Sequence, residues 1–110
     1  DVWKKSNEKI DSVKSILPLN LKKIIDSDIS LIDVRSKLER EKGLLKNSIN
    51  IPLNDFDTNT LIKSDTYYIH CAGGYRSMIA CSLLKRLGFS SLFDISGGFA
   101  DIRKVNLKIN

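Results

Sequence analysis

The stretch that decides both the fold and the site is residues 67–87, which read Tyr67-Tyr-Ile-His-Cys71, then Ala-Gly-Gly-Tyr-Arg76, then Ser77-Met-Ile-Ala-Cys-Ser-Leu-Leu-Lys-Arg-Leu87. The first part is rich in strand-forming residues and the last part repeats apolar residues at helical spacing. We therefore expect a strand at 66–70, a tight loop and a helix at 75–87. Backbone N–H groups of such a loop turn inward, and the helix N-terminus adds partial positive charge. Because both stabilise an anion, Cys71 is predicted to be a catalytic nucleophile that reacts as its thiolate.

Short strands and helices alternate along the rest of the chain. We expect strands at 29–34, 48–52 and 92–95, and helices at 19–26 (capped by Asn20), from Ser36 to a stop at Gly43, and at 99–105. Residues 54–65 are predicted to be a loop with one helical turn at 61–62. The 75–87 helix is predicted to bury Ile79, Leu83, Leu84 and Leu87. This alternation predicts an α/β fold with a mostly parallel sheet, in which sites lie at the carboxyl ends of strands.

Composition narrows the class of protein. The chain has 110 residues, enough for one core, with 42% hydrophobic and 28% charged residues. Its net charge of +5 is spread along the chain, so no nucleic-acid surface is predicted. No apolar run approaches the ~18 residues of a membrane span, and no signal peptide opens the chain. Two cysteines do not make a disulfide framework, so a cytoplasmic protein is expected.

The N-terminal residues read as a separate segment. Residues 1–18 are interpreted as a connector or as the tail of a preceding domain, and 19–110 as the domain itself. The chain begins with Asp1 rather than Met, which we take to indicate a piece of a longer protein. The segment Asp1-Val-Trp-Lys4 is similar to Asp101-Ile-Arg-Lys104. Either the match is due to chance, or the parent protein carries this module in tandem.

Five short motifs occur in order along the chain. They are Leu31-Ile-Asp-Val-Arg35, Glu39 with Gly43, Ser48-Ile-Asn-Ile-Pro52, Cys71-Ala-Gly-Gly-Tyr-Arg-Ser77 and Asp94-Ile-Ser-Gly-Gly-Phe99. In this order and spacing, residues 20–105 resemble the rhodanese-like domain family. The resemblance implies a three-layer sandwich, with a central parallel sheet between helices. The chain departs from the family pattern at Arg40, Leu44, Asn47 and Arg103.

The resemblance also implies a sulfurtransferase mechanism. The Cys71 thiolate would take the outer sulfur of thiosulfate or a low-molecular-weight persulfide and pass it from a Cys71 persulfide to a thiol or cyanide. Backbone N–H groups of the anion-binding loop would hold the charge, with Gly73 and Gly74 at positive φ; this loop comprises Ala72, Gly73, Gly74, Tyr75, Arg76 and Ser77. Arg76 would hold the loop and attract anionic donors.

The remaining polar and aromatic residues near the loop receive more ordinary interpretations. Asp33 and Arg35 are predicted to be a supporting polar pair, and Cys81 a packing residue, with a resolving thiol as the alternative. His70 is expected to be a hydrogen-bonded structural histidine facing away from Cys71. Tyr75 is expected to form a pocket wall, with substrate contact as the alternative. No side-chain cluster has metal-ligand spacing, so neither metal nor cofactor is expected.

Two other functions stay open. Cysteine phosphatases and arsenate reductases also use a His-Cys…Arg loop, but the related phosphatases place one more residue between Cys and Arg than the four found here. A rhodanese-like domain can also serve as a relay or a non-catalytic module. Such domains are fused to metallo-β-lactamase-like persulfide dioxygenases or to a second rhodanese domain. The expected partners are therefore a small sulfur donor and a thiol acceptor, or a fused or separate relay domain.

Overall fold

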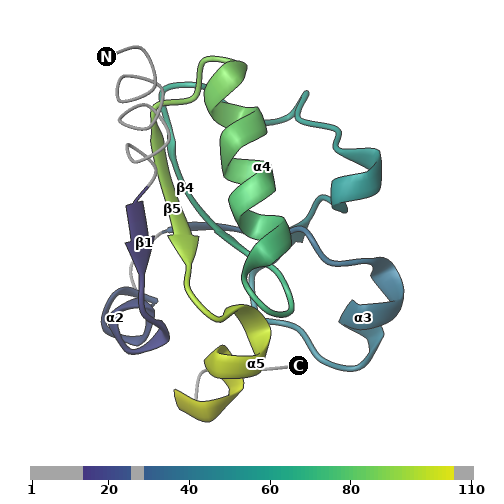
Figure 1. The fold of residues 1–110 in the computed structure, drawn as a ribbon, viewed down its shortest axis with the longest axis vertical. Helices are drawn as coiled ribbons and strands as arrows, with labels where there is room; N and C mark the ends of the chain where they lie inside the picture. The colour runs from purple at the N-terminus through teal and green to yellow at the C-terminus, as the bar shows by residue number, and fades with distance from the viewer. Residues whose placement is uncertain (1–13, 26–28, 106–110) are drawn as a thin grey trace, which may run out of the picture.

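The computed structural model describes residues 14–25 and 29–105, which form a five-stranded sheet with helices against it (Figure 1). The strand order is β1-β5-β4-β2-β3, and every neighbouring pair is parallel. The strands are β1 (Lys14–Ile16), β2 (Ser30–Asp33), β3 (Ser48–Asn50), β4 (Thr66–His70) and β5 (Ser91–Ile95). The helices are α2 (Pro18–Ile24), α3 (Lys37–Glu41), α4 (Tyr75–Arg86) and α5 (Gly98–Ile102), with 3-10 turns η1 (Leu53–Asp55) and η2 (Arg103–Val105). The predicted α/β class with a parallel sheet is confirmed.

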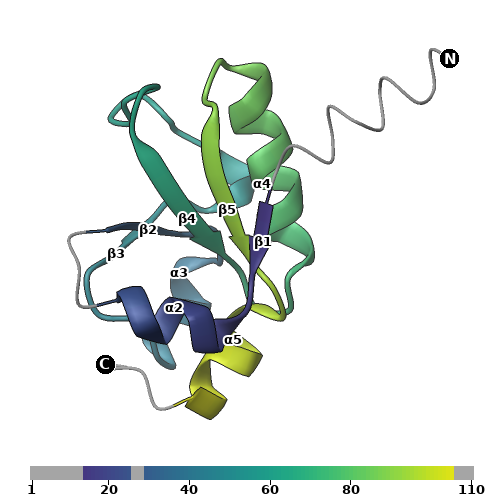
Figure 2. The same ribbon diagram turned by 90° about the vertical axis from the view of Figure 1, so that its left-hand side faces the viewer.

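Two hydrophobic clusters lie on opposite faces of the sheet, because successive residues of a strand point to opposite sides. Ile32 of β2 packs in a cluster with Ala80, Cys81 and Leu84 of α4. Its neighbour Leu31 packs in the other cluster, which includes residues of α2 and α5. Figure 2 shows α4 and α2 on the two sides of the strands. The sheet is therefore the middle layer of the predicted three-layer sandwich.

The N-terminal boundary differs from the expected one. Lys14–Ile16 falls in the segment expected to be a connector, yet it forms β1 and pairs with β5 from Lys14↔Phe93 to Ile16↔Ile95. Helix α2 starts at Pro18 with Leu17 as its N-cap, so Asn20 is not the cap. Proline suits the first helical position because its missing N–H would have no partner there. Residues 1–13 lie outside the described residues, and the tandem hypothesis stays a prediction.

Helix α4 buries Leu84 as predicted, but the rest of its buried face differs from the predicted one. Its buried residues are Ser77, Ala80, Cys81 and Leu84, whereas Ile79 and Leu87 are 36% and 48% exposed. Small side chains on the buried face let the helix approach the sheet closely, and they place Ser77 beside the end of β4. The apolar spacing in the sequence favoured burial of the larger side chains Ile79 and Leu87. Spacing carries no information about how closely a helix packs against the sheet.

The structure also tests the predictions for one helix cap and one turn. The capping box of α3 is confirmed: the Ser36 hydroxyl accepts from the Glu39 N–H, and the Glu39 carboxylate accepts from the Ser36 N–H. The helical turn expected at 61–62 is wrong, and a 3-10 turn occurs instead at Leu53–Asp55. Asn47, one of the positions at which the chain departs from the pattern that it resembles, takes φ 70°, a conformation that asparagine tolerates. Within residues 14–25 and 29–105, no helix is both long and apolar enough to cross a bilayer.

Candidate active site

Cys71 lies between the end of β4 and the start of α4, under a short loop. The Gly74 N–H donates to Cys71 Sγ at 3.0 Å. Gly74 is the N-cap of α4 and takes φ 98°, a left-handed conformation that glycine adopts without steric cost. Gly73 does not take a positive φ, so that part of the prediction is wrong. Cys71 is only 1% exposed, and its sulfur therefore lies in a shielded site with one backbone donor already directed at it.

The first turn of helix α5 is hydrogen-bonded to the loop. The Phe99 N–H donates to the Cys71 carbonyl at 2.6 Å, and the Ala100 N–H donates to the Ala72 carbonyl at 3.1 Å. A Cβ on Gly98 would stand 2.4 Å from the Cys71 carbonyl oxygen. Glycine is needed at this position because two backbone segments pass so close to each other. The motif at residues 94–99 thus helps to hold the Cys71 loop in place.

Arg76 links the loop to helix α3. Its guanidinium makes two hydrogen bonds of 2.7 Å with the Glu39 carboxylate, and both side chains are about one-third exposed. The hydrogen bonds from Arg76 lower the pKa of Glu39 to about 2, and Glu39 in turn raises the pKa of Arg76. The side chain predicted to hold the loop is therefore committed to a carboxylate 37 positions away in the sequence.

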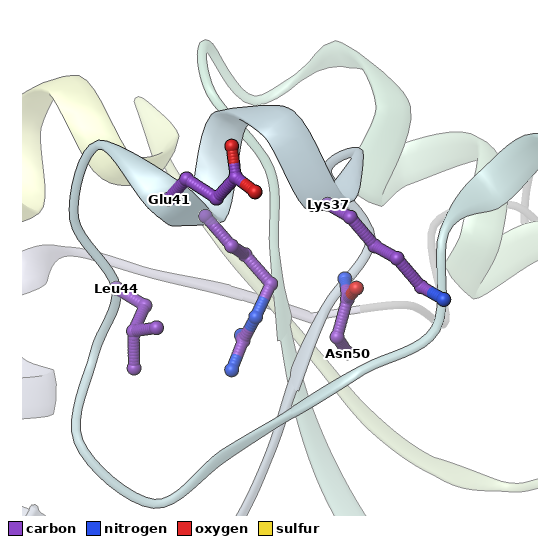
Figure 3. A pocket seen from close by; sticks show the side chains of 5 residues that line it. Lys37, Glu41, Leu44 and Asn50 are labelled. Carbon is purple, nitrogen blue, oxygen red and sulfur yellow. The ribbon is translucent and has the colours of Figure 1, made fainter.

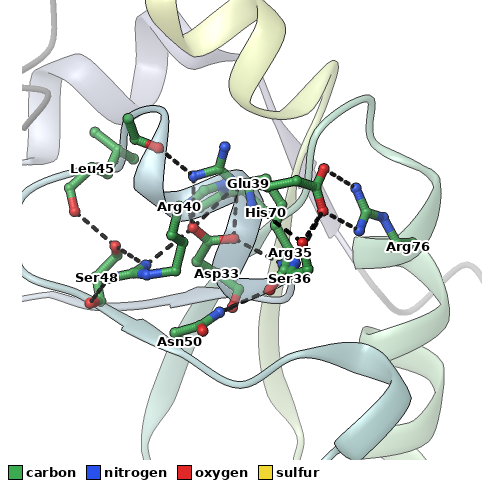
Figure 4. A network of polar contacts seen from close by, with 11 residues as sticks. Asp33, Arg35, Ser36, Glu39, Arg40, Leu45, Ser48, Asn50, His70 and Arg76 are labelled. Atoms are coloured by element: carbon green, nitrogen blue, oxygen red, sulfur yellow. Dashed lines mark hydrogen bonds and ion pairs between the residues drawn. The ribbon is translucent and has the colours of Figure 1, made fainter.

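Asp33 and Arg35 form a buried ion pair behind the site (Figure 4). Arg35 Nη2 lies 2.9 Å from Asp33 Oδ2 and 2.8 Å from the Gly43 carbonyl oxygen. Arg40 reaches the same carboxylate oxygen at 3.1 Å, and Arg35 stacks 4.0 Å from the centre of the Phe99 ring. Burial acts most strongly and would raise the pKa of Asp33, but the hydrogen bonds from Arg35 and the charges of His70 and Arg35 together outweigh it and lower that pKa. The Arg35 side chain thus connects β2 to the first turn of α5, which carries Phe99.

His70 is fully buried, with its ring 6.1 Å from that of Phe99. The expectation of a hydrogen-bonded histidine is wrong, because neither ring nitrogen has a hydrogen-bond partner in the described part of the chain. Its Nε2 lies 3.9 Å from Asp33 Oδ2. Burial lowers the pKa of His70 to about 4, although the Asp33 charge opposes the change. His70 is therefore neutral at pH 7.

Ser77 and Asp94 form a buried polar contact that sequence reasoning missed. The Cys71 thiol donates to Ser77 Oγ at 3.6 Å, and Ser77 Oγ donates to Asp94 Oδ1. Asp94 is 3% exposed, and burial raises its pKa against the hydrogen bonds from Ser77 and Ser15. The sequence carried one signal: an acidic residue interrupts the apolar strand at 92–95.

Two further residues differ in their surroundings. Cys81 is fully buried, and burial followed by the Asp94 charge raises its pKa to about 12, in keeping with a packing residue. Tyr75 is 76% exposed at the first position of α4, so it does not form a buried pocket wall. Among the described residues, no three His, Cys, Asp or Glu side chains gather as they would around a metal ion.

A surface pocket of about 230 Å³ lies beside α3 and β3 (Figure 3). It is lined by Lys37, Arg40, Glu41, Leu44 and Asn50, and therefore by no residue of the Cys71 loop.

Comparison with known proteins agrees with this geometry. The family model described as "Rhodanese-like domain" matches residues 17–104. The chain is 36% identical to a tRNA sulfurtransferase of Thermoplasma acidophilum over 78% of this chain and 17% of that protein. It is 34% identical to a putative sulfur carrier protein, YrkF, of Bacillus subtilis over 87% of this chain and 54% of that protein. A crystal structure of a rhodanese-related protein from Thermoplasma volcanium superposes with a TM-score of 0.80 and 29% identity, covering 88% of this chain and 97% of that one. The chain thus spans about half the length, or less, of these curated relatives. On the family match and these similarities, the chain belongs to the rhodanese-like domain family.

Proposed function

We propose that this domain is a sulfurtransferase whose Cys71 carries the transferred sulfur as a persulfide. The Cys71 thiolate attacks the outer sulfur of thiosulfate or of a low-molecular-weight persulfide. The S–S bond of the donor breaks, and sulfite or a thiolate leaves with the electron pair. A thiol or cyanide acceptor then attacks the outer sulfur of the Cys71 persulfide and restores the thiolate.

The observation that carries this proposal is the position of one sulfur atom, which accepts a backbone N–H at the start of a helix. The Gly74 N–H donates to Cys71 Sγ at 3.0 Å, the Ser77 hydroxyl accepts from the Cys71 thiol at 3.6 Å, and helix α4 begins at Tyr75. A twelve-residue helix places partial positive charge at its N-terminus, which favours the thiolate and the anionic persulfide. Negative charge on sulfur is thus stabilised where the reaction needs it.

The contacts of Arg76 argue against the phosphatase alternative. A phosphatase of this type needs the loop arginine to hold the phosphate oxygens, whereas both Nη atoms of Arg76 here bond to Glu39. The four-residue spacing from Cys71 to Arg76 also leaves a tighter loop, which suits a sulfur atom better than a tetrahedral oxyanion.

The acceptor is proposed to be a relay partner in a reducing, cytoplasmic compartment. Two relatives are named as a sulfur carrier and as an adenylyltransferase and sulfurtransferase, and each is longer than the segment matched here. A domain that is similar to these proteins and has both Cys71 and Arg76 is suited to pass sulfur from one protein to the next. Free thiols at Cys71 and Cys81 are compatible with that compartment.

The test is intact-mass spectrometry after incubation with thiosulfate or glutathione persulfide. We expect the mass to rise by about 32 Da, one sulfur atom, in the wild type and in Cys81→Ala, but not in Cys71→Ser. Addition of a thiol acceptor should remove the added mass. The proposal of a sulfurtransferase is wrong if no donor gives the added mass on Cys71 while the protein hydrolyses an aryl phosphate.

A further inference from the structure

A carboxylate lies two hydrogen bonds away from the reactive sulfur, inside the core. Cys71 Sγ donates to Ser77 Oγ, and Ser77 Oγ donates to Asp94 Oδ1. All three residues are at most 3% exposed; Cys71 directly follows β4, Ser77 lies in the first turn of α4, and Asp94 lies near the end of β5. The path from the thiol to the carboxylate is therefore shielded from bulk water.

We propose that Asp94 receives the proton of the Cys71 thiol through the Ser77 hydroxyl when the thiolate forms. The S–H bond of Cys71 breaks as an O–H bond forms on Ser77 Oγ. The original O–H bond of Ser77 breaks at the same time, and that proton binds Asp94 Oδ1. The electron pair stays on sulfur, and no oxidant, reductant or further reactant is needed. Ser77 contacts the reacting sulfur, and Asp94 is a positioning residue that acts through it.

The same three groups can be hydrogen-bonded in both protonation states. A hydroxyl has one proton to donate and two lone pairs to accept with. With Asp94 ionised, the thiol donates to Ser77 and Ser77 donates to Asp94. With Asp94 protonated, Asp94 donates to Ser77 and Ser77 donates to the thiolate. Neither state leaves one of these buried groups without a partner, so the transfer carries no cost of breaking the chain of hydrogen bonds.

The surroundings of Asp94 leave it without a compensating charge. In residues 14–25 and 29–105, no Lys, Arg or His forms an ion pair with it. Helix α4 contributes Ser77 and the titratable Cys81, β1 contributes Ser15 at 3.5 Å from Oδ2, and β4 places Ile69 opposite it. Burial without a compensating charge destabilises the ionised form of a carboxylate, and this favours its binding of a proton.

The experiment measures the rate at which iodoacetamide alkylates Cys71, followed by peptide mass spectrometry, between about pH 5 and pH 8. In the wild type the thiol with ionised Asp94 and the thiolate with protonated Asp94 hold the same number of protons. Their ratio does not depend on pH, so we expect a plateau in the rate across this range. In Asp94→Asn and Ser77→Ala the rate should fall about tenfold for each pH unit below the thiol pKa.

The matched controls remove the same groups where they face solvent. Asp65→Asn removes an exposed carboxylate before β4, and Ser82→Ala removes an exposed α4 hydroxyl that bonds to the Met78 carbonyl. Both should keep the wild-type plateau. Circular dichroism establishes that each variant is folded. If Asp94→Asn does not fold, Ser77→Ala carries the test, because it interrupts the path and leaves the carboxylate in place.

Three results would overturn the inference. They are a wild-type rate that falls tenfold per pH unit with no plateau, a plateau that survives in Ser77→Ala, and faster alkylation of Asp94→Asn than of wild type at low pH. The last result would mean that Asp94 acts only as a nearby negative charge. The inference rests on the proposed use of Cys71 as a nucleophile, but alkylation requires no sulfur donor. A plateau without persulfide formation would therefore refute the proposed function and leave the proton path standing.

Discussion

The buried His70 makes the stability of the fold depend on pH. It is the single histidine of the chain, and burial lowers its pKa from 6.5 to about 4 in the folded state. Between these values the unfolded chain binds a proton that the folded chain does not. Stability therefore rises with pH across this interval, is fully present above about pH 6.5, and is lost as pH falls toward 4.

The size of the effect follows from the same two numbers. Each pKa unit corresponds to about 1.4 kcal/mol, so the fall from 6.5 to about 4 corresponds to about 3 kcal/mol of unfolding free energy. This is a large share of the 5–15 kcal/mol that typically separates folded from unfolded states, as a rough guide. The cause is a ring whose two nitrogens have no hydrogen-bond partner in the described residues, so that a charge there would be poorly compensated.

The assay is urea unfolding of wild type and His70→Phe at intervals from about pH 7.5 to pH 4. The phenylalanine ring keeps an aromatic group against Phe99, 6.1 Å away in the wild type, and removes the titrating nitrogens. The difference between the two proteins isolates His70, because Asp94 and Glu39 titrate in both. We expect wild type to lose about 3 kcal/mol relative to the variant over this range. A constant difference, or a His70 proton resonance that titrates near pH 6.5, would refute the reasoning.

Three further predictions concern the loop and its supports. Glu39→Gln should lower the unfolding free energy at pH 7 by no more than about 1 kcal/mol, because its ion pair with Arg76 is about one-third exposed. Since the Glu39 pKa falls to about 2 on folding, that contribution is present above about pH 4.5 and lost toward pH 2, and equal urea midpoint shifts at pH 7 and pH 2.5 would contradict it. Gly98→Ala places a Cβ 2.4 Å from the Cys71 carbonyl oxygen at φ 59° and should cost about 2–4 kcal/mol in urea unfolding, with loss of the persulfide adduct. Gly73→Ala is the matched control, since its Cβ meets nothing within 4 Å, and an equal loss there would rule out the close approach as the cause.

Features that depend on residues close together in the chain, such as a strand end or a helix cap, could be predicted from the sequence. Strand β4 was predicted with its observed bounds, Thr66–His70, because strand-forming residues and two glycines mark both its identity and its end. The capping box at Ser36 was predicted because its partners lie three positions apart. The position of Cys71 at the carboxyl end of β4 followed from the same local pattern. Each of these depends on neighbours in the chain, whose preferences act before any tertiary contact forms.

The tertiary structure alone decided which distant groups meet around the sulfur. The Arg76–Glu39 ion pair joins residues 37 positions apart, and Ser77 meets Asp94 across 17 positions. Strand β1 exists because β5 lies beside it, since its own three residues carry little strand pattern. The buried face of α4 was predicted correctly only at Leu84 for the same reason: whether Ile79 or Ser77 is buried depends on what the sheet presents to the helix. Packing and burial are properties of the assembled fold, so they set the surroundings of Cys71, whereas the choice of Cys71 as the nucleophile is a prediction from the sequence.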